Sequence, residues 1–411
     1  MQSFGIHPAT IYLPAPGIDQ KKWAVVACDQ FTSDAAYWQA VEEEVGSAPS
    51  SLRIIYPEIF LSEGEKRIAP IRRAMEEYLA DGTLQAAVEN GFVLTCRTTE
   101  SGSRIGLVAA VDLEDYDYTP GTSAPIRATE GTILSRIPPR VKIREGALLE
   151  SPHVMLLMDD PGDNVLAPLY AARNSLKTVY DTALMAGGGT LKGWAVTDEK
   201  SKSALYAALQ QLSRECNGFL FAVGDGNHSL ATAKACWENK KATLAPEAQA
   251  CDPARYALVE IVNLHSPALQ FEPIHRMVFH ADATQMMLDF AAYLREKGMA
   301  SQPGSDIVFL GNGQETGISV KNAGDMLPVA VLQPFLDRYL QENKKCEIDY
   351  IHEEDAVRSM SLSKGTGILL TSIEKSSLFP GIVSGGVLPR KTFSMGHGHE
   401  KRYYMECRKI K

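Results

Sequence analysis

The run Phe219-Leu220-Phe221-Ala222-Val223, followed at once by Gly224-Asp225-Gly226-Asn227-His228-Ser229, decides the class of fold. Five successive apolar residues are typical of a short strand that is buried on both faces. The two glycines predict a tight turn, because glycine tolerates positive φ angles and lets the backbone approach a ligand closely. A helical pattern then continues to about residue 238. The stretch therefore predicts a strand, a turn and a helix, the repeating unit of an α/β protein.

The turn has the features of an anion-binding site. The first N–H groups of a helix have no partner inside the helix, and they lie at the positive end of its dipole. Such donors suit a phosphate group. We therefore predict that Gly224, Gly226, Asn227 and Ser229 contact a bound anion.

Two polar side chains of the turn are candidate catalytic residues. Asp225 would act as a base or hold a metal ion that carries the phosphate, and His228 would lie at the edge of the same pocket. The alternative is an ordinary turn in which Asn227 or Ser229 only caps the helix. The standard nucleotide motifs G-x-x-x-x-G-K-S/T and G-x-G-x-x-G do not match this stretch.

Strands and helices alternate on both sides of this unit. Residues 92–97 and 105–112 predict an antiparallel hairpin, and residues 199–212 predict a helix with buried leucines. Residues 120–139 are rich in Gly, Pro, Ser and Thr, and long irregular segments of this kind are often functional. The expected fold is an α/β composite with a mixed sheet.

Composition narrows the class of protein. The chain has 411 residues, too many for one ordinary domain, and 45% of them are hydrophobic. Its net charge of −9 disfavours nucleic acid as a partner. Seven scattered cysteines indicate neither a disulfide framework nor a zinc ribbon, and no stretch has membrane-spanning length. We expect a cytoplasmic protein without a membrane partner.

Several segments carry a resemblance to known families. Residues 226–233, Gly-Asn-His-Ser-Leu-Ala-Thr-Ala, resemble the G-x-H-R-x-x-A-A signature of the ParB and sulfiredoxin superfamily. Residues 225–228 resemble the D-G-H-H segment of the bacterial domain-of-unknown-function family 1015. Further segments similar to that family follow in its order along the chain: Ile126–Thr132, Val262–Pro267, Pro273–Arg276 and Gly386–Thr392.

The resemblance implies a domain organisation. A ParB/sulfiredoxin-like core would occupy residues 151–300. An N-terminal α/β segment at 1–150 and a C-terminal α/β segment at 301–411 would complete the pocket. The alternative is that all three parts form one composite domain.

The resemblance also implies bound nucleotide, ATP or ADP with Mg²⁺, at the start of the helix. The arginine of the superfamily signature is Ser229 in this chain, so a positive charge must come from elsewhere or be absent. The family-like segments supply further candidate binding residues, namely Arg127, Glu130, His275, Arg276, Arg390 and Lys391.

Other polar groups are weaker candidates. Two alternatives are open for Arg136, Arg140 and Arg144: a cluster that binds an anion, or a solvated surface with local ion pairs. Arg127 and Glu130 are preferred to them as binding residues. The pair His397 and His399 lacks a spaced third ligand, which favours a solvated loop over a metal site. Asp29 follows a buried strand and either contacts substrate or starts a turn.

Two functions follow from these features. The first is a nucleotide-dependent phosphotransferase that acts on a small metabolite, by analogy a free hydroxyl amino acid such as serine. The second is a nucleotide- or phosphate-binding regulatory module without catalysis, which the replacement by Ser229 favours. A small-molecule substrate is expected in the first case, and a homodimer is left open. Sulfiredoxin chemistry is disfavoured because residues 224–229 contain no cysteine.

Overall fold

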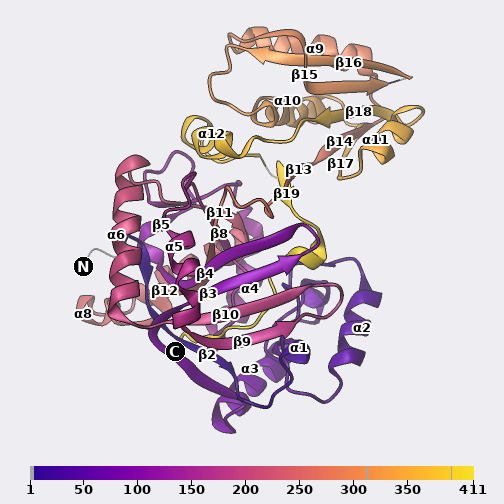
Figure 1. Ribbon diagram of the computed structural model, residues 1–411. Helices are drawn as coiled ribbons and strands as arrows, with labels where there is room; N and C mark the ends of the chain where they lie inside the picture. Colours follow the sequence, from indigo (N-terminus) through magenta and orange to yellow (C-terminus); the bar gives the residue numbers. More distant parts are fainter. Residues whose placement is uncertain (1–3, 312, 390) are drawn as a thin grey trace.

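The computed structural model describes residues 4–311, 313–389 and 391–411. It has a larger first lobe and a smaller second lobe, and the C-terminal end of the chain returns to the first (Figure 1). The expected α/β class with a mixed sheet is confirmed. Among the described residues no helix has the length and apolar character needed to cross a bilayer.

The first lobe is built on one large sheet with the strand order β5-β6-β11-β8-β12-β4-β3-β10-β9, in which β1 pairs with β4 and β2 with β3. Most neighbours are antiparallel, but β6 runs parallel to both β5 and β11, and β8 runs parallel to β12. The strands are β1 (Ile6–His7), β2 (Ala9–Pro14), β3 (Leu84–Thr99), β4 (Gly102–Asp112), β5 (Tyr116–Asp117), β6 (Ile126–Ala128), β8 (Met155–Met158), β9 (Lys177–Ala183), β10 (Thr190–Val196), β11 (Phe221–Asp225) and β12 (Tyr256–Asn263).

Both faces of this sheet are buried. Along β4, Val108 and Ala110 belong to one apolar cluster, whereas Leu107, Ala109 and Val111 belong to another, as the alternation of a strand requires. The helices of this lobe are α1 (Gln20–Trp23), α2 (Ala35–Val45), α3 (Glu65–Ala80), α4 (Ile137–Glu145), α5 (Leu166–Ala171), α6 (Glu199–Glu215), α7 (Asn227–Lys241) and α8 (Pro246–Gln249).

The second lobe has its own antiparallel sheet, with the order β16-β15-β18-β14-β17. Its elements are β14 (His275–Phe279), α9 (Ala283–Glu296), β15 (Ala300–Gly311), β16 (Gln314–Lys321), α10 (Pro328–Glu342), β17 (Glu347–Ile351), α11 (Glu354–Ser361), β18 (Gly365–Leu370) and α12 (Leu378–Gly385). The short pair β13 (Phe271–Pro273) and β19 (Phe393–Met395) lies between the two lobes in Figure 1.

The predicted divisions at residues 150 and 300 do not coincide with the boundaries of the sheets. Strands on both sides of residue 150 share the large sheet, because β11 pairs with β6 and β12 pairs with β4. The last residues of the chain also belong to the first lobe, where β20 (Arg408–Lys409) pairs with β7 (Leu149–Glu150) and Trp23 Nε1 donates to the Met405 carbonyl at 3.1 Å. Long-range pairing of this kind leaves no mark in local composition.

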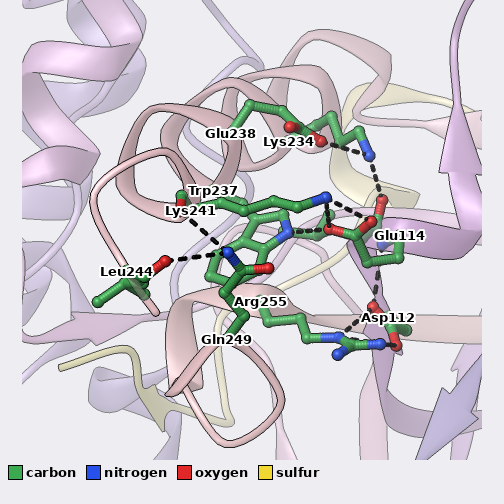
Figure 2. A network of polar contacts seen from close by, with 10 residues as sticks. Asp112, Glu114, Lys234, Trp237, Glu238, Lys241, Leu244, Gln249 and Arg255 are labelled. Carbon is green, nitrogen blue, oxygen red and sulfur yellow. Dashed lines mark hydrogen bonds and ion pairs between the residues drawn. The ribbon is translucent and has the colours of Figure 1, made fainter. Parts of the chain in front are cut away.

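A polar network fixes helix α7 against the end of β4 (Figure 2). The Trp237 indole donates to Glu114, and Lys241 Nζ lies 2.8 Å from both oxygens of that carboxylate. Close by, Arg255 binds Asp112 through both Nε and a terminal nitrogen. The C-terminal half of α7 is therefore held firmly, which sets the position of its N-terminus at the edge of β11.

Candidate anion-binding and proton-transfer site

The turn between β11 and α7 has the geometry that its glycines predict. Gly226 has φ 79° and precedes the first helical residue, and a Cβ atom there would lie 3.0 Å from Val154 Cα. No side chain caps α7 within the described residues. The Asn227 amide instead bonds Thr129 Oγ1 at 3.2 Å, so it does not serve as a cap. The first N–H groups of the helix therefore have no side-chain acceptor in this part of the chain.

Strand β6 brings a second family-like segment to the same edge. Because β6 is parallel to β11, the residues that follow both strands meet at one end of the sheet. Thr129 donates through its hydroxyl to the Val223 carbonyl at 2.6 Å, and its N–H donates to Asn227 Oδ1 at 3.3 Å. Glu130, the next residue, forms a parallel bridge with Leu388. The segments around residues 129 and 388 therefore meet beside the turn.

Glu130 has the most unusual carboxyl group of the site. Burial raises its pKa to about 7, against the opposing effects of the Lys391 charge and of the backbone N–H groups of Thr392 and Lys391. The negative charge of Asp225 raises it further. A carboxyl that titrates near neutral pH can both accept and release a proton during a reaction.

Asp225 is held at the end of β11 by two contacts. Its Oδ1 accepts the Gly226 N–H at 2.9 Å, and its Oδ2 lies 3.3 Å from Lys401 Nζ. The Lys401 side chain is only 13% exposed, so this ammonium group lies inside the site and not on the open surface.

A second charged pair lies against the turn. His153 Nε2 lies 3.7 Å from Asp29 Oδ2, and Nδ1 lies 2.8 Å from the Tyr404 hydroxyl. Although burial opposes the charge, Asp29, Cys28 and Asp225 raise the pKa of His153 to about 10. A Cβ atom on Gly226 would lie 3.4 Å from the His153 ring. A positive imidazolium therefore contacts the turn.

His228 is placed as a neutral donor. The Ile133 N–H donates to its Nε2 at 3.3 Å, so the ring proton lies on Nδ1. Desolvation, together with the charges of Arg136 and Arg140, lowers its pKa to about 4. At neutral pH His228 is therefore poorly suited to act as the predicted base. Its Nδ1–H can instead donate a hydrogen bond to an anion.

The remaining candidates are distributed over the molecule. Lys391 lies beside Glu130, Ser229 is partly exposed in the first turn of α7, and Arg390 lies outside the described residues. Arg127 does not reach the turn: its guanidinium stacks 4.1 Å from the centre of the Phe219 ring, and its Nε donates to the Ala124 carbonyl. Gly224 packs against Leu157 and Met395, where a Cβ atom would have no room.

His275 and Arg276 belong to the second lobe. Both are buried in β14, where His275 Nδ1 accepts the Leu370 N–H at 3.2 Å and Arg276 contacts Gln333, the Ile274 carbonyl and the Tyr350 ring. Arg276 is therefore engaged within the second sheet. The positive charge that replaces the missing arginine at Ser229 would therefore come from residues closer to the turn.

Sequence reasoning missed three residues that the fold brings to the turn. His153 precedes β8, while Lys401 and Tyr404 lie in the C-terminal segment that returns from the second lobe. Asp29 was expected to follow a buried strand, but the residues before it form only an isolated bridge, between Val26 and Tyr403, after the end of α1 at Trp23. A solvated loop was expected at His397 and His399, but His397 is the N-cap of a single 3-10 turn, Gly398–Glu400, which contains His399.

These features define an α/β protein with an uncapped strand-turn-helix and a carboxyl group of raised pKa beside it. The chain belongs to the family described as "Protein of unknown function (DUF1015)", whose model matches residues 12–360. This agrees with the resemblance of the separate segments to that family. No curated protein matches the sequence.

Several solved structures are distantly similar. A free serine kinase in complex with AMP has 10% identity and a TM-score of 0.40 over 74% of this chain and 92% of that chain. A conserved hypothetical protein from Pyrococcus furiosus has 9% identity and a TM-score of 0.35 over 70% of this chain and 90% of that one. A C-terminally truncated SbnI from Staphylococcus aureus has 9% identity and a TM-score of 0.35, with 70% and 82% covered. These values assign no activity, so the function is inferred from the residues of this chain.

Proposed function

We propose that the protein is a phosphotransferase that transfers a phosphoryl group from a nucleotide, ATP or ADP, to a hydroxyl group of a small metabolite such as serine. The observation that carries this proposal is the juxtaposition of Glu130, with a pKa of about 7, and the uncapped start of α7. The Glu130 carboxylate can accept the proton that leaves a hydroxyl, and the first N–H groups of α7 can bind a phosphate.

Each residue of the site has a defined part in this reaction. The N–H groups of Asn227, His228 and Ser229, at the positive end of the α7 dipole, bind the phosphoryl oxygens. Lys401 and the His153 imidazolium supply positive charge close to the turn. These two groups supply the positive charge that the signature arginine would carry at the position of Ser229.

Glu130 acts as the general base. The hydroxyl oxygen of the acceptor forms a new bond to the phosphorus atom, and the bond between phosphorus and the leaving phosphate oxygen breaks. The hydroxyl proton passes to the Glu130 carboxylate. Magnesium usually accompanies such nucleotides, held by phosphate oxygens and one or two carboxylates, and Asp225 at the turn would supply one of them.

A binding module without catalysis is the second candidate. It is favoured by the hydrogen bond from Ile133 to His228, which occupies the nitrogen that a base would use, and by Ser229 in place of an arginine. In that case the site would bind a nucleotide and leave it intact.

The test is a comparison of binding and turnover in wild type and Glu130→Gln. Thermal shift with ATP and ADP measures binding, because a ligand of the folded state raises the midpoint by mass action. Incubation of ATP with serine, followed by ³¹P NMR, detects phosphoserine. We expect a midpoint shift in both proteins and phosphoserine only with wild type. A shift without turnover in wild type supports the binding module, and no shift with either nucleotide rejects both functions.

A further inference from the structure

Two buried arginines outside the turn have no hydrogen-bonded carboxylate among the described residues. Arg97 on β3 and Arg104 on β4 are directly opposite each other in the antiparallel register. They are 2% and 6% exposed, and the Nε atom of each is buried without a hydrogen-bond partner. Neither guanidinium forms a salt bridge with a residue of the described chain. Like charges at opposite positions of adjacent strands repel each other, and their burial adds a desolvation cost.

The nearest buried carboxylates are already used by another arginine. Glu260 accepts the Thr95 hydroxyl at 3.0 Å through Oε1 and Arg402 at 2.5 Å through Oε2. Glu406 accepts Arg402 at 2.6 Å and the Tyr180 hydroxyl. The charge of Glu260 acts on both Arg97 and Arg104, but burial and the charge of Arg104 dominate at Arg97 and lower its pKa to about 10. The cluster therefore holds more buried positive than negative charge.

The arginine pair lies on the sheet face that is crossed by the chain segment of the proposed active site. A terminal nitrogen of Arg97 donates to the His399 carbonyl at 3.1 Å, and two residues later Lys401 pairs with Asp225. The next residue, Arg402, pairs with Glu260 on the same face. Residues 399–402 therefore connect the arginine pair to the turn within a few residues of chain.

We propose that Arg97 and Arg104 bind the carboxylate group of the acceptor metabolite. This rests on the proposed function: the start of α7 takes the phosphoryl group, and the arginine pair takes the acceptor's own anionic group at the other end of the site. Two guanidinium groups side by side offer forked donors that match a planar carboxylate. The substrate class is therefore a small hydroxy acid or hydroxy amino acid, and a neutral polyol is excluded.

The test uses D-glycerate and L-serine as carboxylate probes, with glycerol and serinamide as matched probes that lack the carboxylate. Their dissociation constants are measured by calorimetry on wild type, Arg104→Met and Arg104→Lys. Arg338→Met serves as the control, since Arg338 is an exposed residue of α10. We expect a carboxylate probe to bind wild type and the control, and to bind at least about tenfold more weakly to both Arg104 variants. Glycerol and serinamide should bind none of the proteins.

Ligand-free stability separates a ligand-binding arginine from a structural one. Removal of an uncompensated buried charge should leave the thermal midpoint of Arg104→Met equal to or above that of wild type. A lower midpoint for Arg104→Met, together with unchanged carboxylate binding by Arg104→Lys, would overturn the proposal. So would inorganic phosphate binding that depends on Arg104 while carboxylate binding does not.

The two proposals fail in different ways. If wild type binds ADP but neither carboxylate probe, the carboxylate site is rejected and the proposed phosphoryl transfer is left without this substrate class. If a carboxylate probe binds in an Arg104-dependent manner and no nucleotide binds, the carboxylate site stands and the phosphotransferase is rejected.

Discussion

Two groups of buried charges lie side by side in the first lobe, and they differ in how completely they are paired. Around Arg402 each carboxylate oxygen has a donor, from Arg402 itself, from Thr95 or from Tyr180. Around the turn the charged groups are more loosely paired, at 3.3 Å for Asp225 and Lys401 and 3.7 Å for Asp29 and His153, and Glu130 has a pKa of about 7. Closed networks of the first kind hold a fold together, whereas shifted groups of the second kind are typical of functional sites.

The largest loss of stability should follow when the fully paired network around Arg402 is broken. Arg402→Met leaves Glu260 and Glu406 buried without their main partner, so we expect a loss of about 3–5 kcal/mol in the free energy of unfolding. Urea denaturation measures it. The control Arg338→Met removes two surface ion pairs, with Glu296 and Glu342, and should change stability by about 1 kcal/mol or less. Equal effects of the two substitutions would contradict the distinction between the two groups.

The next effect should appear in turnover and not in stability. Glu130→Gln keeps the shape of the side chain and removes the proton acceptor, so we expect the rate of phosphoryl transfer to fall about 100-fold or more. The rise of the thermal midpoint on addition of nucleotide should persist in this variant. In wild type the rate should rise with pH through about 7, because the base is active when deprotonated. The exposed Glu247→Gln in α8 is the matched control, and a loss of turnover there as well would point to an indirect effect.

A smaller effect is expected at the turn. Gly226→Ala places a Cβ atom 3.0 Å from Val154 Cα in a backbone conformation with φ 79°, which should cost about 1–2 kcal/mol of stability. Nucleotide affinity should fall as well, since the N–H groups shift. Gly121→Ala, at φ 76° with open space around it, separates backbone strain from the contact. If both variants lose nucleotide affinity equally, the turn has no special role.

The last effect concerns the dependence of stability on pH. The pKa of His153 is raised from 6.5 to about 10 in the folded protein, so the stability that its charge contributes is complete below about pH 6.5 and is lost as pH rises through about 10. His153→Gln should therefore flatten the decline of stability between about pH 7 and pH 10. Denaturant midpoints at a series of pH values check this. Parallel curves for the two proteins would show that the imidazolium contributes nothing.

The sequence predicted the local unit well because its signals are local. The apolar run, the two glycines and the helical pattern lie within twenty residues, and β11 and α7 begin and end close to the expected positions. The hairpin of β3 and β4 was predicted for the same reason. Its strands are longer than expected, since the whole of β3 pairs with several neighbours.

The composition of the site was harder to predict because it depends on contacts far apart in the chain. Lys401 reaches Asp225 only after the chain has passed through the second lobe, and nothing around residue 401 indicates a site. Conversely, Arg127 and Arg276 lie in suggestive segments, yet each packs against an aromatic ring elsewhere. The family-like segments bring Glu130 and Lys391 close to the turn, but the segments alone do not show which side chains face it.

The central claim is that the first N–H groups of α7 bind the phosphates of a nucleotide. The most direct measurement is the shift of backbone amide NMR signals when ADP is added to the protein. The account predicts the largest shifts at Asn227, His228 and Ser229, with smaller shifts near Glu130 and Lys401. Shifts that cluster elsewhere, or no shifts at saturating ADP, would contradict it.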